Sequence, residues 1–117
     1  MKSIMVPSDL VGEELSAVCF VRDYVELHFD GPLLRALTNI EVTRPDIRKT
    51  FPEPGSRDAI CALIGMRITS LDMRASHGVC ITFEDSSAIL IPLATDAESG
   101  PEAAHFVPGE NAPIQIW

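Results

Sequence analysis

The sequence predicts a mainly β fold in which two pseudo-repeated antiparallel β-meanders form a barrel-like sheet or a small sandwich, with one or two short helices. Three observations predict it: two stretches that match at a nearly constant spacing, apolar and polar residues that alternate with a period of two, and turn residues between the alternating runs. At 117 residues the chain is expected to be a single domain, with repeats at residues 10–37 and 63–93 and a connector at residues 39–55.

The repeat is the strongest of these signals. The two stretches match at an offset of about 53 residues at first and about 55 at the end, so each loop of the second copy adds roughly one residue. The matching pairs include Leu10 and Leu63, Gly12 and Gly65, Phe29 and Phe83, and Leu34 and Ile89. Because neither meander can bury its apolar face alone, we expect the two to pack about a pseudo-twofold axis. The alternative is a coincidence of β-periodicity.

The first repeat opens with an apolar run over residues 15–21, which is typical of a central strand covered on both faces. Residues 24–29 then alternate, as residues 79–83 do in the second repeat. The side chains expected to be buried are Val25, Leu27, Phe29, Val79, Ile81 and Phe83, whereas Glu26 and His28 are expected to be more exposed.

Asp30-Gly31-Pro32-Leu33 is a hairpin signal. Gly31 supplies the positive φ of the first central position of a type II′ turn, and the fixed φ of Pro32 suits the second. Such a turn would pair Phe29 with Leu34, His28 with Arg35, and Leu27 with Ala36.

Proline and glycine interrupt any regular element between residues 39 and 55, which predicts an irregular connector. Ser56 is expected to cap a short helix that Gly65 ends, with Ile60, Leu63 and Ile64 on its apolar side. Strands are expected at residues 68–73, 79–83 and 88–93, a second short helix at residues 101–106, and a terminal strand at residues 114–117.

A family resemblance follows from these motifs. Leu-x-Gly at residues 10–12, followed by Val-x-Leu-x-Phe-Asp-Gly at residues 25–31, recurs from Leu63 to Phe83 and is closed by Glu102-Ala103-Ala104. In these features the chain resembles small uncharacterised bacterial all-β proteins, some of which are similar to immunity proteins of toxin systems. The motifs consist of structural glycines and core positions, so the resemblance carries over no catalytic residue. The second hairpin departs from the pattern, because Asp85-Ser86 stands in place of Asp-Gly.

The net charge of −8 argues against nucleic acid as a partner, because affinity for nucleic acid depends on neutralising phosphates. A basic protein surface is the partner that acidity favours, and the alternative is that acidity only keeps the protein soluble. No run approaches the roughly 18 apolar residues that span a bilayer, so no membrane partner is expected. Residues 1–7 lack the apolar core of a signal peptide, which predicts a cytoplasmic location.

Neither a metal nor a cofactor is expected from the three histidines and three cysteines. Only His77 and Cys80 have local spacing, and they straddle a turn and a strand without a matching pair elsewhere. No Cys-x-x-Cys occurs, which favours reduced thiols. Cys19 and Cys61 are expected to fill the core, so that Cys80 alone is worth a test for exposure.

The candidate binding residues are Glu26, His28 and Arg35, which form one local cluster of mixed chemistry on the outer face of the first hairpin. Their counterparts in the second repeat are Cys80, Thr82 and Leu90, so the polarity is one-sided. One-sided polarity can mark a binding surface, and the alternative is an exposed sheet face with a stabilising cross-strand pair. Glu13-Glu14 is expected to be ordinary solvated surface.

These observations favour a small cytoplasmic protein-binding module, immunity-like and non-catalytic, that presents an acidic surface. The alternative is a small-molecule-binding β-barrel or a minor enzyme with a pocket between the two repeats. A side-chain-filled interface between the repeats would favour the first, and a cavity of several hundred cubic ångströms with converging polar groups would favour the second. Open edge strands and the terminal Trp117 predict either a homodimer or docking of the last strand on its own sheet.

Overall fold

The computed structural model describes residues 7–22, 24–74, 78–93, 104–108 and 114–116. Two short helices and ten strands follow one another in these ranges: η1 (Pro7–Leu10), β1 (Ala17–Val21), β2 (Tyr24–His28), β3 (Leu33–Ala36), β4 (Glu41–Thr43), β5 (Arg48–Thr50), α1 (Ser56–Cys61), β6 (Ile68–Arg74), β7 (Gly78–Phe83), β8 (Ala88–Ile91), β9 (Ala104–Val107) and β10 (Gln115–Ile116). The predicted mainly β class is confirmed, and of the one or two short helices expected, α1 is present; η1 was not predicted.

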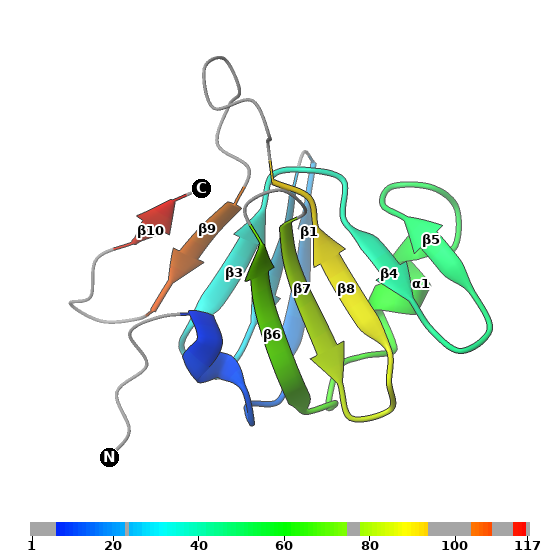
Figure 1. Ribbon diagram of the computed structural model, residues 1–117. Coiled ribbons are helices and arrows are strands. Elements are labelled where there is room, and N and C mark those ends of the chain that lie inside the picture. The colour runs from blue at the N-terminus through cyan, green and yellow to red at the C-terminus, as the bar shows by residue number, and fades with distance from the viewer. Residues whose placement is uncertain (1–6, 23, 75–77, 94–103, 109–113, 117) are drawn as a thin grey trace.

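The strands form two five-stranded antiparallel sheets, in the orders β1-β2-β3-β9-β10 and β5-β4-β8-β7-β6. The sheets pack face to face as two open layers, so the fold is a sandwich and the barrel alternative does not occur (Figure 1). The meander of each repeat lies in one sheet: β1-β2-β3 in the first and β6-β7-β8 in the second. The two strands that follow each meander in the chain join the other sheet. As a result β4 pairs with β8, and β9 pairs with β3.

The strand registers confirm the pseudo-repeat. Within the first meander Val18 pairs with Leu27 and Leu27 pairs with Leu34, and within the second Leu71 pairs with Ile81 and Ile81 pairs with Ile89. These are the pairs that the offsets of about 53 to 55 residues bring into correspondence. The two meanders therefore match both in sequence and in the pairing of their strands.

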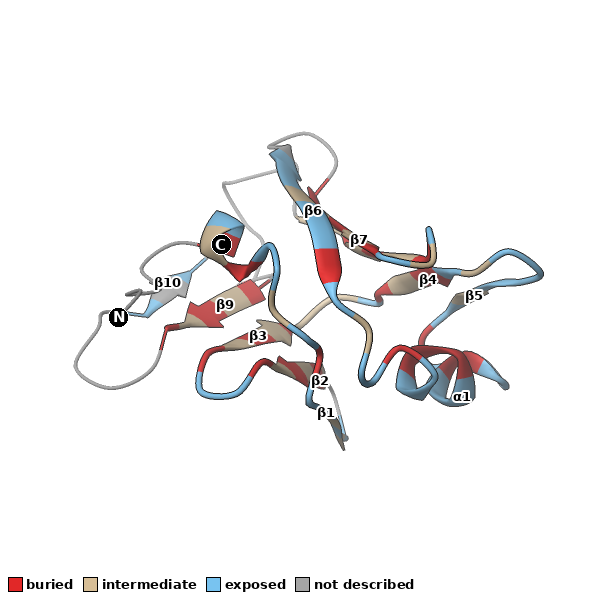
Figure 2. Ribbon diagram, turned by 90° about the horizontal axis from the view of Figure 1, so that it is seen from below, coloured by how far each residue is buried: buried red, intermediate tan, exposed pale blue. Residues whose placement is uncertain are grey.

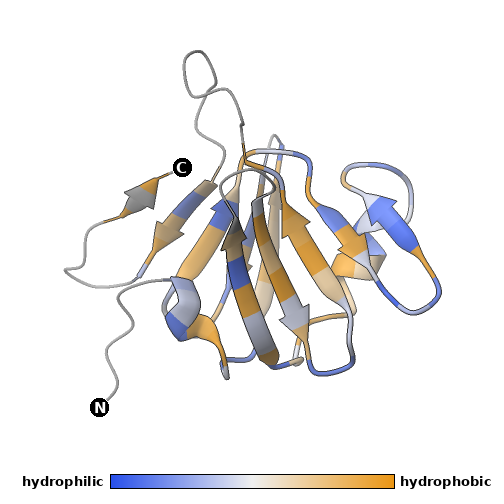
Figure 3. Cartoon of the chain, viewed as in Figure 1, coloured by the Kyte–Doolittle hydropathy of each residue, from blue (hydrophilic) through white to orange (hydrophobic). Residues whose placement is uncertain are grey.

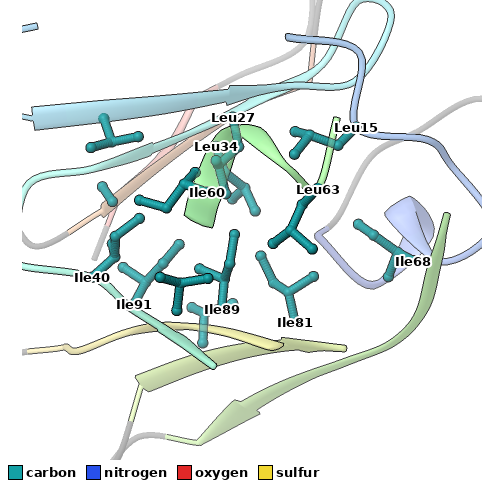
Figure 4. Close-up of a cluster of buried hydrophobic side chains, with 14 of the residues drawn as sticks. Leu15, Leu27, Leu34, Ile40, Ile60, Leu63, Ile68, Ile81, Ile89 and Ile91 are labelled. Carbon is teal, nitrogen blue, oxygen red and sulfur yellow. The ribbon is translucent and has the colours of Figure 1, made fainter. Parts of the chain in front are cut away.

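The core lies between the two sheets and is filled by side chains (Figures 2 and 4). Leu27 and Leu34 of the first sheet face Ile81 and Ile89 of the second, and all four are 0% exposed. The six residues predicted to be buried are at most 1% exposed, whereas Glu26 and His28 are partly exposed, so the predicted alternation is confirmed. Burial of each large aliphatic side chain contributes about 1.5–3 kcal/mol to folding.

Apolar colouring runs along β7 and β8, whereas β4 is mixed and β5 is mainly hydrophilic (Figure 3). Together β4 and β5 form a hairpin. This hairpin lies in the predicted irregular connector, so that prediction is wrong. Short strands are tolerated there because β4 completes the ladder on β8, with Val42 opposite Ile89. Helix α1 contacts β1, β4 and β5, and buries Ile60 at one end of the core.

The first hairpin has a different turn from the predicted one. The backbone N–H of Phe29 donates to the carbonyl of Pro32, so the central residues are Asp30 and Gly31, with φ of 48° and 122°. Positive φ at both central positions is typical of a type I′ turn, which Asp-Gly favours. The register therefore differs by two residues from the prediction, and Leu27 pairs with Leu34. The faces are unchanged because the side-chain period is also two.

The second hairpin carries the extra loop residue that the offset predicts. Its loop consists of Glu84, Asp85 and Ser86, and Ser86 takes a positive φ of 71°. The N–H and hydroxyl of Ser87 both donate to the Asp85 carboxylate at 2.9 Å. The backbone hydrogen bond from Ser87 holds the pKa of Asp85 below its usual value, against the opposing effect of burial.

Strand β1 is an edge strand, and the prediction of a central strand covered on both faces is wrong. Only Val18 and Phe20 pack against the core, whereas Ala17 and Cys19 are exposed. A continuous apolar run therefore does not distinguish a central strand from an edge strand here. The ring of Phe20 stacks on that of Phe51, with centroids 5.6 Å apart, which covers the inner side of β1.

Two further expectations, on the cysteines and on the helix cap, are corrected. Cys19 and Cys61 are exposed and Cys80 is half-buried, so the first two do not fill the core; all three are free thiols, as predicted. Gly55, with φ of 87°, precedes α1, and Ser56 is its buried first residue without a capping hydrogen bond.

The helix expected at residues 101–106 is wrong where the structure describes it, because β9 begins at Ala104. Residues 101–103 lie outside the described ranges. The predicted terminal strand is confirmed as β10, which pairs with β9, although Trp117 lies outside the described residues. No helix in the described ranges is long and apolar enough to cross a membrane.

Candidate functional site

Four polar side chains lie in a group across the outer face of the first sheet, and we call Glu26, His28, Arg35 and His105 the polar strip. The register places Glu26 of β2 opposite Arg35 of β3, and Arg35 opposite His105 of β9. The three residues that the sequence singled out are therefore brought together. His105 was missed because its segment was expected to be helical, and no local pattern placed it beside β3.

The strip is held by hydrogen bonds between its own members. Arg35 Nε donates to Glu26 Oε2 at 2.8 Å, and His28 Nε2 lies 3.1 Å from Glu26 Oε1. Because a carboxylate only accepts, His28 carries its proton on Nε2 in this arrangement. Arg35 Nη1 lies 3.0 Å from His105 Nδ1, and because a guanidinium only donates, this nitrogen of His105 is unprotonated.

The Glu26 carboxyl is charged in this setting. Burial alone would raise its pKa, but the hydrogen bonds from Arg35 and His28 outweigh burial, so its pKa lies below the usual value. Its side chain is 14% exposed and that of Arg35 is 27% exposed. The charges of Glu26 and Arg35 cancel in this ion pair, so the polar strip has little net charge. It can therefore bind a partner through directed hydrogen bonds more than through charge.

An open pocket of about 430 Å³ lies where the two repeats meet, and we call it the junction pocket. The residues that line it are Gly12, Glu13, Glu14, Leu15, Ser16, Asp30, Ile64, Gly65 and Arg67. A pocket between the repeats was expected only for the alternative function, and Glu13-Glu14 was expected to be solvated surface. The residues that line this pocket could not be predicted, because Glu13 and Glu14 are brought to Arg67 only by the packing of one repeat on the other.

The floor of the junction pocket is a short backbone ladder. Gly12 and Leu15 donate to the carbonyls of Ile68 and Met66, and Gly65 and Ile68 donate to those of Leu15 and Glu13. These bonds form symmetric pairs: the bond from Gly12 to Ile68 corresponds to the bond from Gly65 to Leu15 when each residue is replaced by its counterpart 53 positions away. Glu14 and Arg67 are counterparts of each other and form a bridge, so the pseudo-twofold axis passes between them. Gly12 and Gly65 share nearly the same φ, 96° and 92°, which side chains with a Cβ rarely adopt.

Carboxylates outnumber bases in the junction pocket. Glu13, Glu14 and Asp30 line it, and among the described residues Arg67 is the only base that does so. Arg67 Nη1 donates to the carbonyl of Gly12 at 2.6 Å, and Nη2 lies 4.0 Å from Glu14 Oε2. One guanidinium that is already hydrogen-bonded therefore faces three carboxylates, which leaves the pocket acidic.

Ser16 joins the junction pocket to the polar strip. Its hydroxyl donates to the carbonyl of His28 at 2.9 Å and accepts from the backbone N–H of Asp30 at 3.2 Å. Because this hydroxyl is occupied by backbone groups, it is not set beside a general base as a nucleophile would be. Within the described residues no group of three or more His, Cys, Asp or Glu side chains could hold a metal ion.

No protein-family model matches the chain, and comparison with curated proteins and with solved structures finds no match.

Proposed function

We propose that the protein is a non-catalytic module that binds another protein, and that the contacting surface of this partner is basic. The contact surface would comprise the outer face of the first sheet, where the polar strip lies, together with the adjoining junction pocket. In this division of roles the strip supplies directed hydrogen bonds, and the carboxylates supply long-range attraction.

The observation that carries the proposal is the distribution of unpaired charge. Most described arginines are already engaged: Arg35, Arg44, Arg48 and Arg67 lie within 2.8–4.0 Å of Glu26, Asp85, Glu41 and Glu14, and Arg57 stacks on the ring of Phe51. In contrast, the carboxylates of Glu13 and Asp30, which line the junction pocket, form no ion pair in the ranges that the structure describes. The surface charge that remains for a partner is negative.

The side chains at the candidate site support binding over catalysis. Arg35 and His28 both bind the Glu26 carboxylate, and the Ser16 hydroxyl binds backbone groups, so this carboxylate and this hydroxyl are held by the fold. A catalytic group needs a free lone pair or proton directed at a substrate atom. The filled space between the sheets likewise favours the binding module over a barrel with an internal ligand.

Affinity capture tests the proposal. The tagged protein is used to retain partners from an extract of its native cells at about 0.1 M and about 1 M salt, where the Debye length falls from roughly 10 to roughly 3 Å. We expect a protein with a basic surface that is retained at low salt and lost at high salt, and that rebinds when purified. Retention of an acidic protein, or retention that does not depend on salt, would contradict the proposal.

A second candidate function has its own support in the junction pocket. Its volume of about 430 Å³ lies within the range of roughly 300–1,000 Å³ found for small-molecule sites. A small cation bound there would make the protein a carrier or sensor of that compound. Native mass spectrometry of the protein from its own cells distinguishes the two functions, because a carrier retains a small molecule and a protein-binding module retains a polypeptide.

A further inference from the structure

We propose that the junction pocket receives one arginine or lysine side chain of the protein partner. This inference rests on the proposed function and deepens it, because it names the group of the partner that the protein recognises. It follows from the charge of the pocket, its apolar wall, its size and the rigidity of its floor.

The charge of the pocket selects a cation. Glu13, Glu14 and Asp30 line it, and the guanidinium of Arg67 is bound to the carbonyl of Gly12, so it is directed at backbone as well as at Glu14. Asp30, at the tip of the first hairpin, also lines the pocket. A positive group that enters the pocket therefore meets carboxylates from two separate segments of the first repeat.

The apolar wall selects a cation on a long aliphatic stem. Ile64 lines the pocket and is 44% exposed, so it presents apolar surface to a group that enters. Lysine and arginine bury their methylene groups along apolar surface while the charged end stays near water or carboxylates. A compact inorganic cation would use the carboxylates but would leave Ile64 uncovered.

The floor holds these groups in place before binding. The carbonyl and N–H groups of residues 12–15 and 65–68 pair with one another at 2.7–3.0 Å, and the buried Leu15 and Ile68 anchor this ladder to the core (Figure 4). Asp30 is fixed through the bond from its N–H to Ser16 Oγ. Binding to a preformed site loses less conformational entropy, which favours recognition of a single side chain.

The occupant is a side chain of a protein because the pocket is open and adjoins a wide sheet face. Ser16 belongs to the pocket, and it is hydrogen-bonded to the backbone of His28 in the polar strip. A polypeptide that covers the outer face of β1 and β2 therefore passes the mouth of the pocket, where it can insert a basic residue.

A short peptide tests this inference. Acetyl-Gly-Ser-Arg-Ser-Gly-amide is titrated into the ¹⁵N-labelled protein, and the same peptide with citrulline in place of arginine serves as the uncharged control. We expect the arginine peptide, and not the citrulline peptide, to shift the amide signals of Gly12, Ser16 and Gly65. Equal shifts with both peptides, or no shift with either, would overturn the inference.

Matched variants locate the site. Glu13→Gln with Glu14→Gln removes two charges from the pocket, and Asp46→Asn with Asp72→Asn removes two charges from exposed positions outside it. We expect the pocket variant to weaken binding of the arginine peptide about tenfold, and the control variant to change it less than about twofold. Asp30→Asn, which tolerates the positive φ of this position, gives a further test if the double variant does not fold.

Two other outcomes separate this inference from the proposed function. If the basic partner is captured but its retention is unaffected by Glu13→Gln with Glu14→Gln, the pocket inference is wrong and the proposed function stands. If free agmatine binds about tenfold more tightly than the peptide, the occupant is a small amine and the protein side chain is rejected.

Discussion

Two glycine substitutions test the backbone of the fold with different expected costs. Gly65 and Gly78 both have positive φ, 92° and 126°, so alanine is strained at either position. A Cβ added to Gly65 would meet no atom within 4 Å, whereas a Cβ added to Gly78 would lie 2.2 Å from the carbonyl oxygen of Ile91. The first substitution therefore changes only conformational energy, and the second also forces two backbones apart.

The magnitudes follow from this geometry. For Gly65→Ala we expect a loss of about 1–2 kcal/mol, the cost of a left-handed backbone for an L-residue. For Gly78→Ala we expect a loss of more than about 3 kcal/mol, because the backbone of Ile91 is fixed by its ladder with Val79 and cannot move without breaking β7 from β8.

Urea denaturation followed by circular dichroism measures both free energies of unfolding. A thermal melt gives a second reading, in which each kcal/mol lowers Tm by roughly 4 °C for a chain of this size. A Gly78→Ala protein that loses no more stability than Gly65→Ala would refute the close approach of β7 to the end of β8.

Four further predictions can be checked with the same protein. Leu27→Ala and Ile81→Ala should each cost about 2–5 kcal/mol in urea denaturation, and similar amounts, because both are fully buried at equivalent positions. Glu26→Gln should cost about 1 kcal/mol at neutral pH. Because folding lowers the pKa of Glu26, its stabilisation is present above the unfolded pKa and is lost as pH falls through the folded one, so wild type and variant should converge in acid. Cys19 and Cys61 should react with a thiol reagent in the folded protein, whereas burial would delay reaction until denaturation. If the predicted homodimer forms through β10, light scattering should show a dimer that its removal converts to a monomer, and a monomeric wild type rejects the dimer.

Local signals predicted much of the fold. Alternation identified the buried faces of β2 and β7, and the offset between repeats anticipated the longer loop of the second hairpin. The turn of the first hairpin was misplaced by one residue, because both Asp30-Gly31 and Gly31-Pro32 are acceptable central pairs of a tight turn. Only the bond from Phe29 to Pro32 decides between them.

Non-local packing accounts for the failures. Nothing local indicates that β4 leaves its own meander to pair with β8, or that β9 returns to β3. If these two pairings between sheets are not known, the sequence of residues 39–55 predicts an irregular connector and the sequence before Phe106 predicts a helix. The three residues of the polar strip that lie in the first hairpin were predicted from the sequence. His105 was missed because it is 70 residues away from Arg35 in the chain.

The junction pocket shows why a duplicated fold can hold a site that neither copy predicts. On a twofold axis each residue meets its own counterpart, so the same acid in both copies would place two carboxylates together and repel. The chain has Glu14 in one copy and Arg67 in the other, which replaces that repulsion with attraction. The adjacent positions differ in the same way: Glu13 in the first copy corresponds to Met66 in the second. Asymmetric substitution about the axis therefore leaves an excess of carboxylates in the pocket, to which Asp30 of the first hairpin adds a third.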